Sequence, residues 1–429
     1  MRPIVRTPAH QTDALAELVC SNTFKSTETS NAHGLLKAEL RLLGSLLLEC
    51  AEAARVPGGS ALAVDRAEFA RLATGRVSAH PNIEIVREEA AELPERGIVA
   101  TGPLTSEKLS GAIREALGAD SLAFYDAIAP IVSVDSLDME RLFRASRYGK
   151  MTEVTGGTKE THGTEVTEEE VTEGAEVTRG DYLNAPMTRD QYEAFIRALT
   201  EADQHQTKHE FDKDTPYFEG CLPVEEMAAR GPETLRFGPM KPVGLPDPRT
   251  GREAYAVVQL RQEDRAGQMW NLVGFQTRLR IPEQQRVFRM IPGLEEAEFL
   301  RFGSIHRNAY INSPRHLSAH LSLRERPMTM FAGQITGVEG YTESLGTGLL
   351  AGRNLFEQLN GRPPRLPPAT TMLGALLRHL RDADPRHFQP MNANFGLLEP
   401  LEKPPRDKRL KKEALARRAL SDMTVFANG

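Results

Sequence analysis

Three glycines occupy the point where a strand pattern gives way to a helix pattern, and this feature restricts the fold most strongly. Gly333, Gly337 and Gly340 end or follow the strand pattern TMFAG (329–333), and a helical pattern begins directly after them. Glycines let backbone amides approach a ligand closely, and a helix N-terminus attracts anionic or electron-rich atoms. The spacing by itself is compatible both with helix packing and with cofactor binding.

The first third of the chain alternates between strand and helix patterns. Strand patterns lie at 61–64, 83–88 and 97–102, and helix patterns lie at 34–54, 65–72 and 104–118. This alternation is typical of an α/β fold with a parallel sheet. The strand pattern GIVATG ends at Thr101 and Gly102, so two glycine-containing strand ends can meet at one pocket, as in a doubly wound nucleotide-binding sheet.

The middle of the chain predicts a second domain. Segments at 254–264, 269–279 and 298–313 are rich in β-branched and aromatic residues, which indicates a mostly antiparallel sheet. A proline-rich linker at 362–370 leads to a final helical section. The expected division is a first domain at 1–130 that resumes at 326–361, an inserted domain at 131–325, and a helical, basic C-terminal segment at 362–429.

Charge is distributed unevenly along the chain. The 429 residues sum to −6, but residues 151–178 carry eight glutamates against one lysine and alone contribute −7. This segment repeats Thr-Glu-Val-Thr and has no aromatic residue, so we expect a disordered surface insertion. Residues 406–418 carry seven basic and two acidic side chains, which fit a solvated basic helix or a phosphate contact.

Composition argues against several classes of protein. Apolar stretches such as 42–50 are broken by polar residues well short of a bilayer span, and the start lacks the apolar core of a secretory signal. The eleven histidines are scattered, so we expect no metal site. The three cysteines show no CxxC spacing, which indicates reduced thiols and a cytoplasmic protein.

Two cysteines and one histidine are candidates for chemistry. Cys221 precedes a proline turn and an acidic helix start, and Cys20 ends an apolar run at a polar turn. Free cysteines are more often buried hydrophobic residues than nucleophiles, so both roles stay open at this point. Cys50 lies on the apolar stripe of a helix pattern, which predicts a core position. His306 fits a structural role more readily than acid–base chemistry.

Motifs along nearly the whole chain resemble one family. They are, in order, TPAHQTDALAELVCSN, NAHGLLKAELR, ATGPLTSE, GCLPVEEMAARG, RFGPMKPVGLPDPRTG, VVQLRQED, HRNAYINSP, FAGQITGVEGY and HFQPMNANFGLL. Together they are similar to the TrmFO family, which comprises folate- and flavin-dependent tRNA methyltransferases that form T-loop ribothymidine. The resemblance implies an α/β, Rossmann-like FAD-binding domain with an inserted, mostly antiparallel second domain.

The resemblance also implies a reaction and its participants. In this family a reduced flavin takes the one-carbon unit of 5,10-methylenetetrahydrofolate onto its N5 and passes it to C5 of a T-loop uridine. A thiolate first adds to C6, because uracil C5 is a poor nucleophile. NADH or NADPH is the expected reductant and the T-arm of tRNA the expected partner. The uridine must be extruded into the pocket, and we expect a monomer.

Residue roles carry over by position. Cys221 matches the family's proposed nucleophile, and Cys20 matches a second functional cysteine that acts as an acid or base or protects the activated flavin. His306 matches a histidine that stacks on the folate pterin. The resemblance implies that FAD is bound by Thr101, Gly102, Gly333, Gln334, Gly337, Val338, Gly340 and Tyr341.

The chain departs from the family pattern at 151–178 and at its start. In the family, MRP follows a glutamate, and a strand, a GxGxxG turn and a helix of about 30 residues in all precede it. We therefore expect an upstream start, and for this chain a sheet without its central strand and its pyrophosphate loop. Two alternatives stay open, namely a GidA-type enzyme that modifies wobble uridines and a non-catalytic tRNA-binding remnant.

Overall fold

The computed structural model describes residues 10–102, 104–117, 121–149, 180–205 and 222–429. The helices are α1 (Ala32–Leu42), α2 (Leu46–Ala53), α3 (Arg66–Ser78), α4 (Glu107–Leu117), α5 (Arg189–Glu201), α6 (Val224–Ala229), α7 (Thr234–Phe237), α8 (Ile281–Phe288), α9 (Ser313–His316), α10 (Tyr341–Leu359), α11 (Met372–Asp382) and α12 (Lys408–Asn428). The strands are β1 (Thr23–Ser26), β2 (Arg55–Val56), β3 (Ala61–Val64), β4 (Gly97–Val99), β5 (Ser121–Ile128), β6 (Ile131–Ser133), β7 (Phe143–Arg144), β8 (Tyr182–Met187), β9 (Pro246–Asp247), β10 (Arg252–Glu253), β11 (Ala256–Gln262), β12 (Met269–Leu272), β13 (Phe299–Arg301), β14 (Ser304–Ile311) and β15 (Thr329–Phe331).

The mostly antiparallel sheet predicted for the middle of the chain is confirmed. Six strands follow the order β13-β6-β12-β11-β8-β7, and each pairing is antiparallel. Successive side chains of a strand point to opposite faces, so one face can be apolar while the other is polar. The apolar face packs with α5, α6 and α8 in a core that includes the fully buried Trp270, Phe275 and Phe288.

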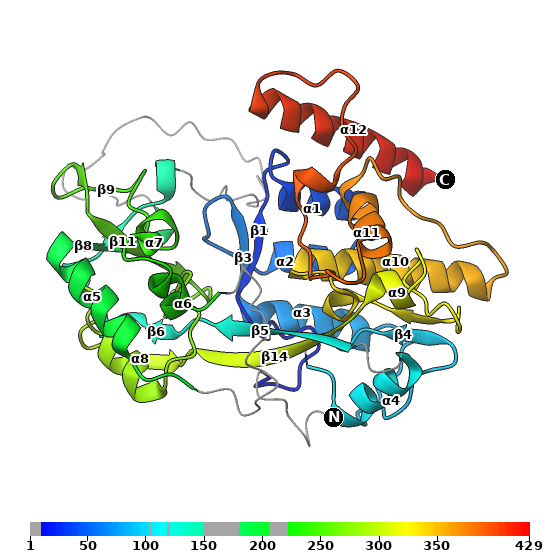
Figure 1. Cartoon of the computed structure of the whole chain (residues 1–429), viewed down its shortest axis with the longest axis horizontal. Coiled ribbons are helices and arrows are strands. Elements are labelled where there is room, and N and C mark those ends of the chain that lie inside the picture. The colour runs from blue at the N-terminus through cyan, green and yellow to red at the C-terminus, as the bar shows by residue number, and fades with distance from the viewer. Residues whose placement is uncertain (1–9, 103, 118–120, 150–179, 206–221) are drawn as a thin grey trace, which may run out of the picture.

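A second hydrophobic core surrounds a small parallel sheet. β15 pairs parallel with β4, which places the carboxyl ends of both strands at one edge. The strands predicted within 97–102 and 329–333 are therefore confirmed. α1, α10, α11 and α12 contribute apolar side chains to this core, Leu36, Leu350 and Leu376 among them. In Figure 1 these helices lie on one side of the molecule, and α5 and α8 lie on the other.

Two predicted strands differ from the structure. The segment 83–88 forms no strand, and the side chains of Ile83 and Val86 are exposed. β-branched residues form a strand only where a neighbouring strand completes the hydrogen bonding, and among the described residues this segment has no such neighbour. The segment 61–64 is a strand, β3, but it pairs antiparallel with β1 and β2 and does not extend the parallel sheet.

The helix expected over 34–54 is two helices, because the chain turns between α1 and α2. Gly44 has a φ of 70°, which favours glycine, and Ser45 caps α2 with its side chain. The helix expected after Asp65 is confirmed as α3, and the Asp65 carboxylate accepts a hydrogen bond from the Glu68 amide.

The predicted domain boundaries stay a prediction. The two hydrophobic cores show which segments of the chain pack together. The long antiparallel pair β5–β14 runs between the two sides of the molecule (Figure 1). From the end of β14 onward, side chains between Tyr310 and Leu323 contribute to the core around the parallel sheet. The insertion expected at 151–178 lies outside the described residues, and most of the basic run 406–418 forms the first half of α12.

Candidate active site

A cavity of about 660 Å³ lies between the parallel-sheet core and the antiparallel sheet. One wall consists of the carboxyl ends of β4 and β15 and the start of α10. Residues of β11, of β12 and of the turn after β12 form another wall, and the segment 16–25 forms a third. The two glycine-containing strand ends that the sequence predicted to converge are thus brought to one cavity.

Six of the eight predicted FAD-binding residues line this cavity. They are Thr101, Gly102, Gly333, Gln334, Gly340 and Tyr341. Gly337 and Val338 lie elsewhere in the same turn. A Cβ on Gly337 would lie 2.5 Å from the ring of Phe388, and Val338 is fully buried in the core. These two residues therefore shape the turn without forming cavity surface.

Two glycines expose the start of α10 to the cavity. Gly333 has a φ of 76° and Gly340 a φ of 118°, backbone conformations that favour glycine. A Cβ on Gly340 would also lie 2.3 Å from a carboxylate oxygen of Glu343. The first turn of α10 is consequently open to a ligand, and its dipole favours electron-rich atoms there.

A buried carboxylate lies in this first turn. Glu343 Oε1 is 3.0 Å from His33 Nδ1 and accepts a hydrogen bond of 2.9 Å from the Ala393 amide. Burial acts to raise the pKa of Glu343, but the hydrogen bond with His33 and the positive charge of Lys25 outweigh it and hold the pKa below its usual value. Glu343 is therefore ionised at neutral pH.

A buried lysine lies close to this carboxylate. Lys37 Nζ donates hydrogen bonds to the carbonyl oxygens of Ser26 (2.8 Å) and His33 (2.9 Å). Burial lowers the pKa of Lys37 to about 7, although the negative charge of Glu343 acts in the opposite direction. The charge of Lys37 therefore changes near neutral pH, behind the wall formed by α10.

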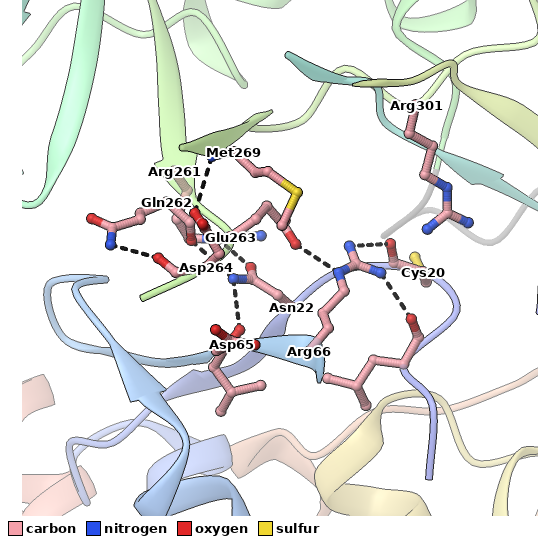
Figure 2. A network of polar contacts seen from close by, with 12 residues as sticks. Cys20, Asn22, Asp65, Arg66, Arg261, Gln262, Glu263, Asp264, Met269 and Arg301 are labelled. Carbon is pink, nitrogen blue, oxygen red and sulfur yellow. Dashed lines mark hydrogen bonds and ion pairs between the residues drawn. The ribbon is translucent and has the colours of Figure 1, made fainter. Parts of the chain in front are cut away.

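Two arginines hold the backbone around Cys20, which lines the cavity. Figure 2 draws the hydrogen bonds of one of them, Arg66, as dashed lines. Arg66 donates hydrogen bonds to the carbonyl oxygens of Leu18 (2.8 Å) and Cys20 (3.0 Å). Arg301 donates to the carbonyl oxygen of Val19, at 3.1 Å. Three successive carbonyl groups are thus fixed by side chains from α3 and β13, which orients the Cys20 backbone.

Two further contacts complete this arrangement. Arg66 Nε donates to Glu263 Oε2 at 2.6 Å, and the Glu263 side chain is only 1% exposed. Burial acts to lower the pKa of Arg66, but the charge of Glu263 outweighs it and raises the pKa, so the pair is ionic. The Cys20 amide donates to the Tyr341 hydroxyl at 3.0 Å. The segment that carries Cys20 is therefore bonded to α3, β13 and α10.

The antiparallel sheet presents two buried polar side chains to the cavity. Arg261 and Asn271 lie directly opposite each other on β11 and β12, line the cavity, and are 7% and 4% exposed. Asn22 accepts a hydrogen bond of 2.8 Å from Arg261 Nε. It also donates to the carbonyl oxygens of Val64 and Gln262, so it links β3 to β11 (Figure 2).

The remaining predicted site residues fall in different places. Cys221 lies outside the described residues, but the amide of Val224, three positions later, donates at 2.7 Å to the carbonyl of Gln276, which lines the cavity. His306 lies on β14, and its side chain is outside the described part of the structure. Cys50 is 5% exposed in the parallel-sheet core, which confirms its predicted core position.

The buried and partly buried charged groups around the cavity were not identified from the sequence. Arg66, Arg261, Glu263 and Glu343 are residue types that are mostly exposed, so a single one gives no signal. The motif VVQLRQED, which contains Arg261 and Glu263, was the sequence signal that could have indicated these groups. Charged residues that continue an apolar strand indicate that one of its faces meets a polar site.

The residues of the cavity fit a flavin. Two parallel strand ends, two glycines with left-handed backbone and the start of a long helix lie at one wall, where planar and electron-rich groups can approach the backbone. Within the described part of the chain, no group of three or more histidine, cysteine, aspartate or glutamate side chains is placed to hold a metal ion. No helix found there is both long and apolar enough to cross a membrane.

Comparison with known proteins gives consistent results. A family model described as glucose inhibited division protein A matches residues 4–172 and 156–363. A methylenetetrahydrofolate–tRNA-(uracil-5-)-methyltransferase TrmFO from Geobacter sulfurreducens is 52% identical over 425 residues, which cover 99% of this chain and 91% of that protein. A protein of the same name from Thermus thermophilus is 50% identical over 430 residues, 100% of this chain and 90% of that protein.

A solved structure shows the same fold. GidA from Aquifex aeolicus superposes with a TM-score of 0.63 at 14% identity, covering 96% of this chain and 68% of that chain. This likeness confirms the predicted α/β fold class.

Proposed function

Since the chain belongs to the TrmFO family of folate-dependent tRNA (uracil-5-)-methyltransferases, we propose that the cavity is the place where a one-carbon unit reaches C5 of a T-loop uridine. The chain is a folate-dependent tRNA (uracil-5-)-methyltransferase, and the observation that carries this conclusion is 50–52% identity over 99% or more of the chain. FAD and 5,10-methylenetetrahydrofolate are the cofactor and the one-carbon donor that the family implies. NADH or NADPH is the reductant that we propose.

FAD, when bound and reduced, supplies the carrier that moves the one-carbon unit from folate to uracil. The six cavity-lining residues of the two strand ends and of the α10 start would hold it. Glu343, bonded to His33 and to the Ala393 amide, keeps the first turn of α10 in position. Gly337 and Val338 support that turn from behind.

The uracil is activated by a thiolate. Cys221 adds to C6, the C5=C6 electron pair shifts toward O4, and C5 becomes the nucleophile that takes the one-carbon unit. Loss of the C5 proton and of the thiolate then restores the double bond, and the two electrons that convert the one-carbon unit into a methyl group would come from the reductant, NADH or NADPH. Cys20, fixed in the cavity wall, serves as an acid or base or protects the flavin. His306, on β14, stacks on the folate pterin.

The tRNA meets the protein partly through α12. The first half of this helix exposes Lys408, Arg409, Lys411, Lys412 and Arg417, and such side chains neutralise phosphates. We assign to them a contact with the T-arm, from which the target base is extruded into the cavity. The enzyme acts as a monomer in the cytoplasm, where tRNA is modified.

An assay of product formation tests this proposal. The purified chain is incubated with an unmodified tRNA transcript, FAD, 5,10-methylenetetrahydrofolate and NADH or NADPH, and 5-methyluridine is located by mass spectrometry. We expect the product in the T-loop. Cys221→Ala should abolish it while flavin stays bound, and Cys50→Ala, a change in the core, should keep the activity of its folded fraction.

Three outcomes would contradict the proposal. Modification of an anticodon wobble uridine would favour a GidA-type enzyme. A chain that binds tRNA but makes no product under any of these conditions would be a binding remnant. Full activity of Cys221→Ala would remove the nucleophile assignment and leave the family assignment intact.

A further inference from the structure

Arg261 is a buried positive charge that faces the cavity. Its side chain is 7% exposed, and its Nε donates a hydrogen bond of 2.8 Å to Asn22 Oδ1. Among the described residues, no carboxylate lies within ion-pair distance of its guanidinium group. A buried charge of this kind costs several kcal/mol unless a partner compensates it. We therefore expect a ligand to supply a hydrogen-bond acceptor for the terminal nitrogens of Arg261.

Asn271 adds a second polar group beside it. Arg261 and Asn271 form a directly opposed pair on adjacent antiparallel strands, so their side chains lie on the same face, toward the cavity. Asn271 is 4% exposed, and its side chain makes no hydrogen bond to the described residues. A guanidinium donor next to an amide, which both donates and accepts, matches the carbonyl–NH edge of a planar heterocycle.

The position of Asn22 fixes this pair in space. Its amide nitrogen donates to the carbonyl oxygens of Val64 and Gln262, at 3.0 and 2.9 Å, so its oxygen must face Arg261. Arg261 cannot swing toward solvent without leaving Asn22 Oδ1 unpaired in a fully buried place. The donor is therefore preorganised, as a group that stabilises a developing negative charge should be.

We propose that Arg261 and Asn271 bind the O4–N3 edge of the target uracil and that Arg261 stabilises the negative charge that develops on O4. When the thiolate sulfur bonds to C6, the π electrons of C5=C6 move to give an enolate with its charge on O4, and no proton needs to move in this step. Arg261 donates hydrogen bonds to that oxygen, and Asn271 accepts one from N3–H. The inference rests on the proposed function of the cavity.

The location favours uracil over the other ligands with a similar edge. The residues assigned to flavin lie on the wall formed by β4, β15 and α10, whereas Arg261 and Asn271 belong to the sheet wall. Gln276, also on the sheet side, bonds to Val224, three positions after the proposed nucleophile Cys221. The uracil must lie near that nucleophile.

The test traps the first chemical step without needing flavin or folate. A T-arm RNA with 5-fluorouridine at the target position is mixed with Arg261→Met, Asn271→Asp or the unchanged protein, and the rate of forming a denaturation-resistant adduct is measured. In this adduct the sulfur bonds to C6 and a proton from water adds to C5. We expect Arg261→Met to slow the rate by about 100- to 1,000-fold, as for removal of an oxyanion donor. Asn271→Asp should also slow it, because its carboxylate would pair with Arg261.

A matched control is Arg144→Met. Arg144 lies over the Trp270 ring, 5.3 Å from its centroid, and is not among the residues that line the cavity. This variant should form the adduct at the normal rate. In Arg261→Met the affinity for RNA should be unchanged, because phosphate contacts determine it. The visible spectrum of bound flavin should also be unchanged, because the wall formed by β4, β15 and α10 determines it.

Each alternative outcome has a distinct meaning. A normal adduct rate in Arg261→Met overturns the inference, and so does a loss of bound flavin or a raised KM for the folate with a normal adduct rate, since either assigns Arg261 to another ligand. If the unchanged protein forms neither adduct nor 5-methyluridine, the proposed function itself fails. If the unchanged protein is active and Arg261→Met forms the adduct at the normal rate, the inference about Arg261 fails and the proposed function stands.

Discussion

Replacing Arg66 by methionine should destabilise the protein through the charge that it leaves behind. Arg66 makes hydrogen bonds of 2.6 Å to Glu263 and of 2.8 and 3.0 Å to the carbonyl oxygens of Leu18 and Cys20. Oε1 of Glu263 is buried and has no hydrogen-bond partner among the described residues, so Arg66 is the direct partner of this carboxylate, and Arg301 acts on it only through its more distant charge. Methionine has a similar length but no charge and no donor.

The magnitude follows from the burial of the pair. The Glu263 side chain is 1% exposed, and removing one partner of a buried ion pair costs about 3–5 kcal/mol. Replacing both partners by methionine removes the unpaired charge, so Arg66→Met/Glu263→Met should be more stable than Arg66→Met by at least about 1 kcal/mol. The double variant should still be less stable than the unchanged protein, because two carbonyl groups lose their donor.

Urea unfolding measures these free energies. Circular dichroism follows the whole chain, and fluorescence follows Trp270, the single tryptophan, which is fully buried in the core of the antiparallel sheet. Coincident transitions justify a two-state treatment. A loss below about 1 kcal/mol in Arg66→Met, or a double variant less stable than the single one, would refute the argument from unpaired charge.

The remaining predictions concern a turn, a pH dependence and the RNA contact. Gly337→Ala should lower the free energy of unfolding by about 1–3 kcal/mol, because φ is 85° there and the added Cβ clashes with Phe388. Gly361→Ala should cost less, because its φ is 71° but nothing lies within 4 Å of the added Cβ. Thermal unfolding of the two variants measures the difference. Burial lowers the pKa of Lys37 to about 7. Between pH 7 and 10 the Lys37 amine is therefore mostly protonated in the unfolded chain and mostly neutral in the folded chain. The contribution of this group to the free energy of unfolding rises with pH in that range, by at most about 1.4 kcal/mol per pH unit. Lys37→Met should remove that slope in urea titrations at several pH values, and an unchanged slope would contradict the assignment. Lys411→Ala/Lys412→Ala should weaken T-arm binding and reduce the slope of log affinity against log salt by about 1 per lost contact, whereas Lys108→Ala on α4 should not.

Sequence reasoning located the backbone of the site better than its side chains. The strand ends at Gly102 and Gly333 were predictable, because an apolar run followed by glycine and a helix pattern is a local signal. The absence of a strand at 83–88 was not predictable, because a strand depends on a partner elsewhere in the chain. The antiparallel pairing of β3 was missed for the same reason.

Polar side chains of the site depend on long-range contacts. Arg66 meets Glu263 and Asn22 meets Arg261 only after the two cores come together, and nothing in their local sequence reports these pairs. Cys20 was a candidate from its local sequence, and the family resemblance gave it a role. Its position in the cavity wall agrees with that role, which stays a proposal.

The bonding of the Cys20 segment has a consequence for the order of folding. Its partners are distant along the chain, with sequence separations of 48 residues to Arg66, 282 to Arg301 and 321 to Tyr341. Contacts between distant residues carry a large loop-closure entropy and form late. The cavity wall should therefore be completed among the last steps of refolding, after the helices and local hairpins have formed. A partly folded chain would then contain native secondary structure and lack the site, and newly made protein would become competent only when its C-terminal half has joined the N-terminal segment.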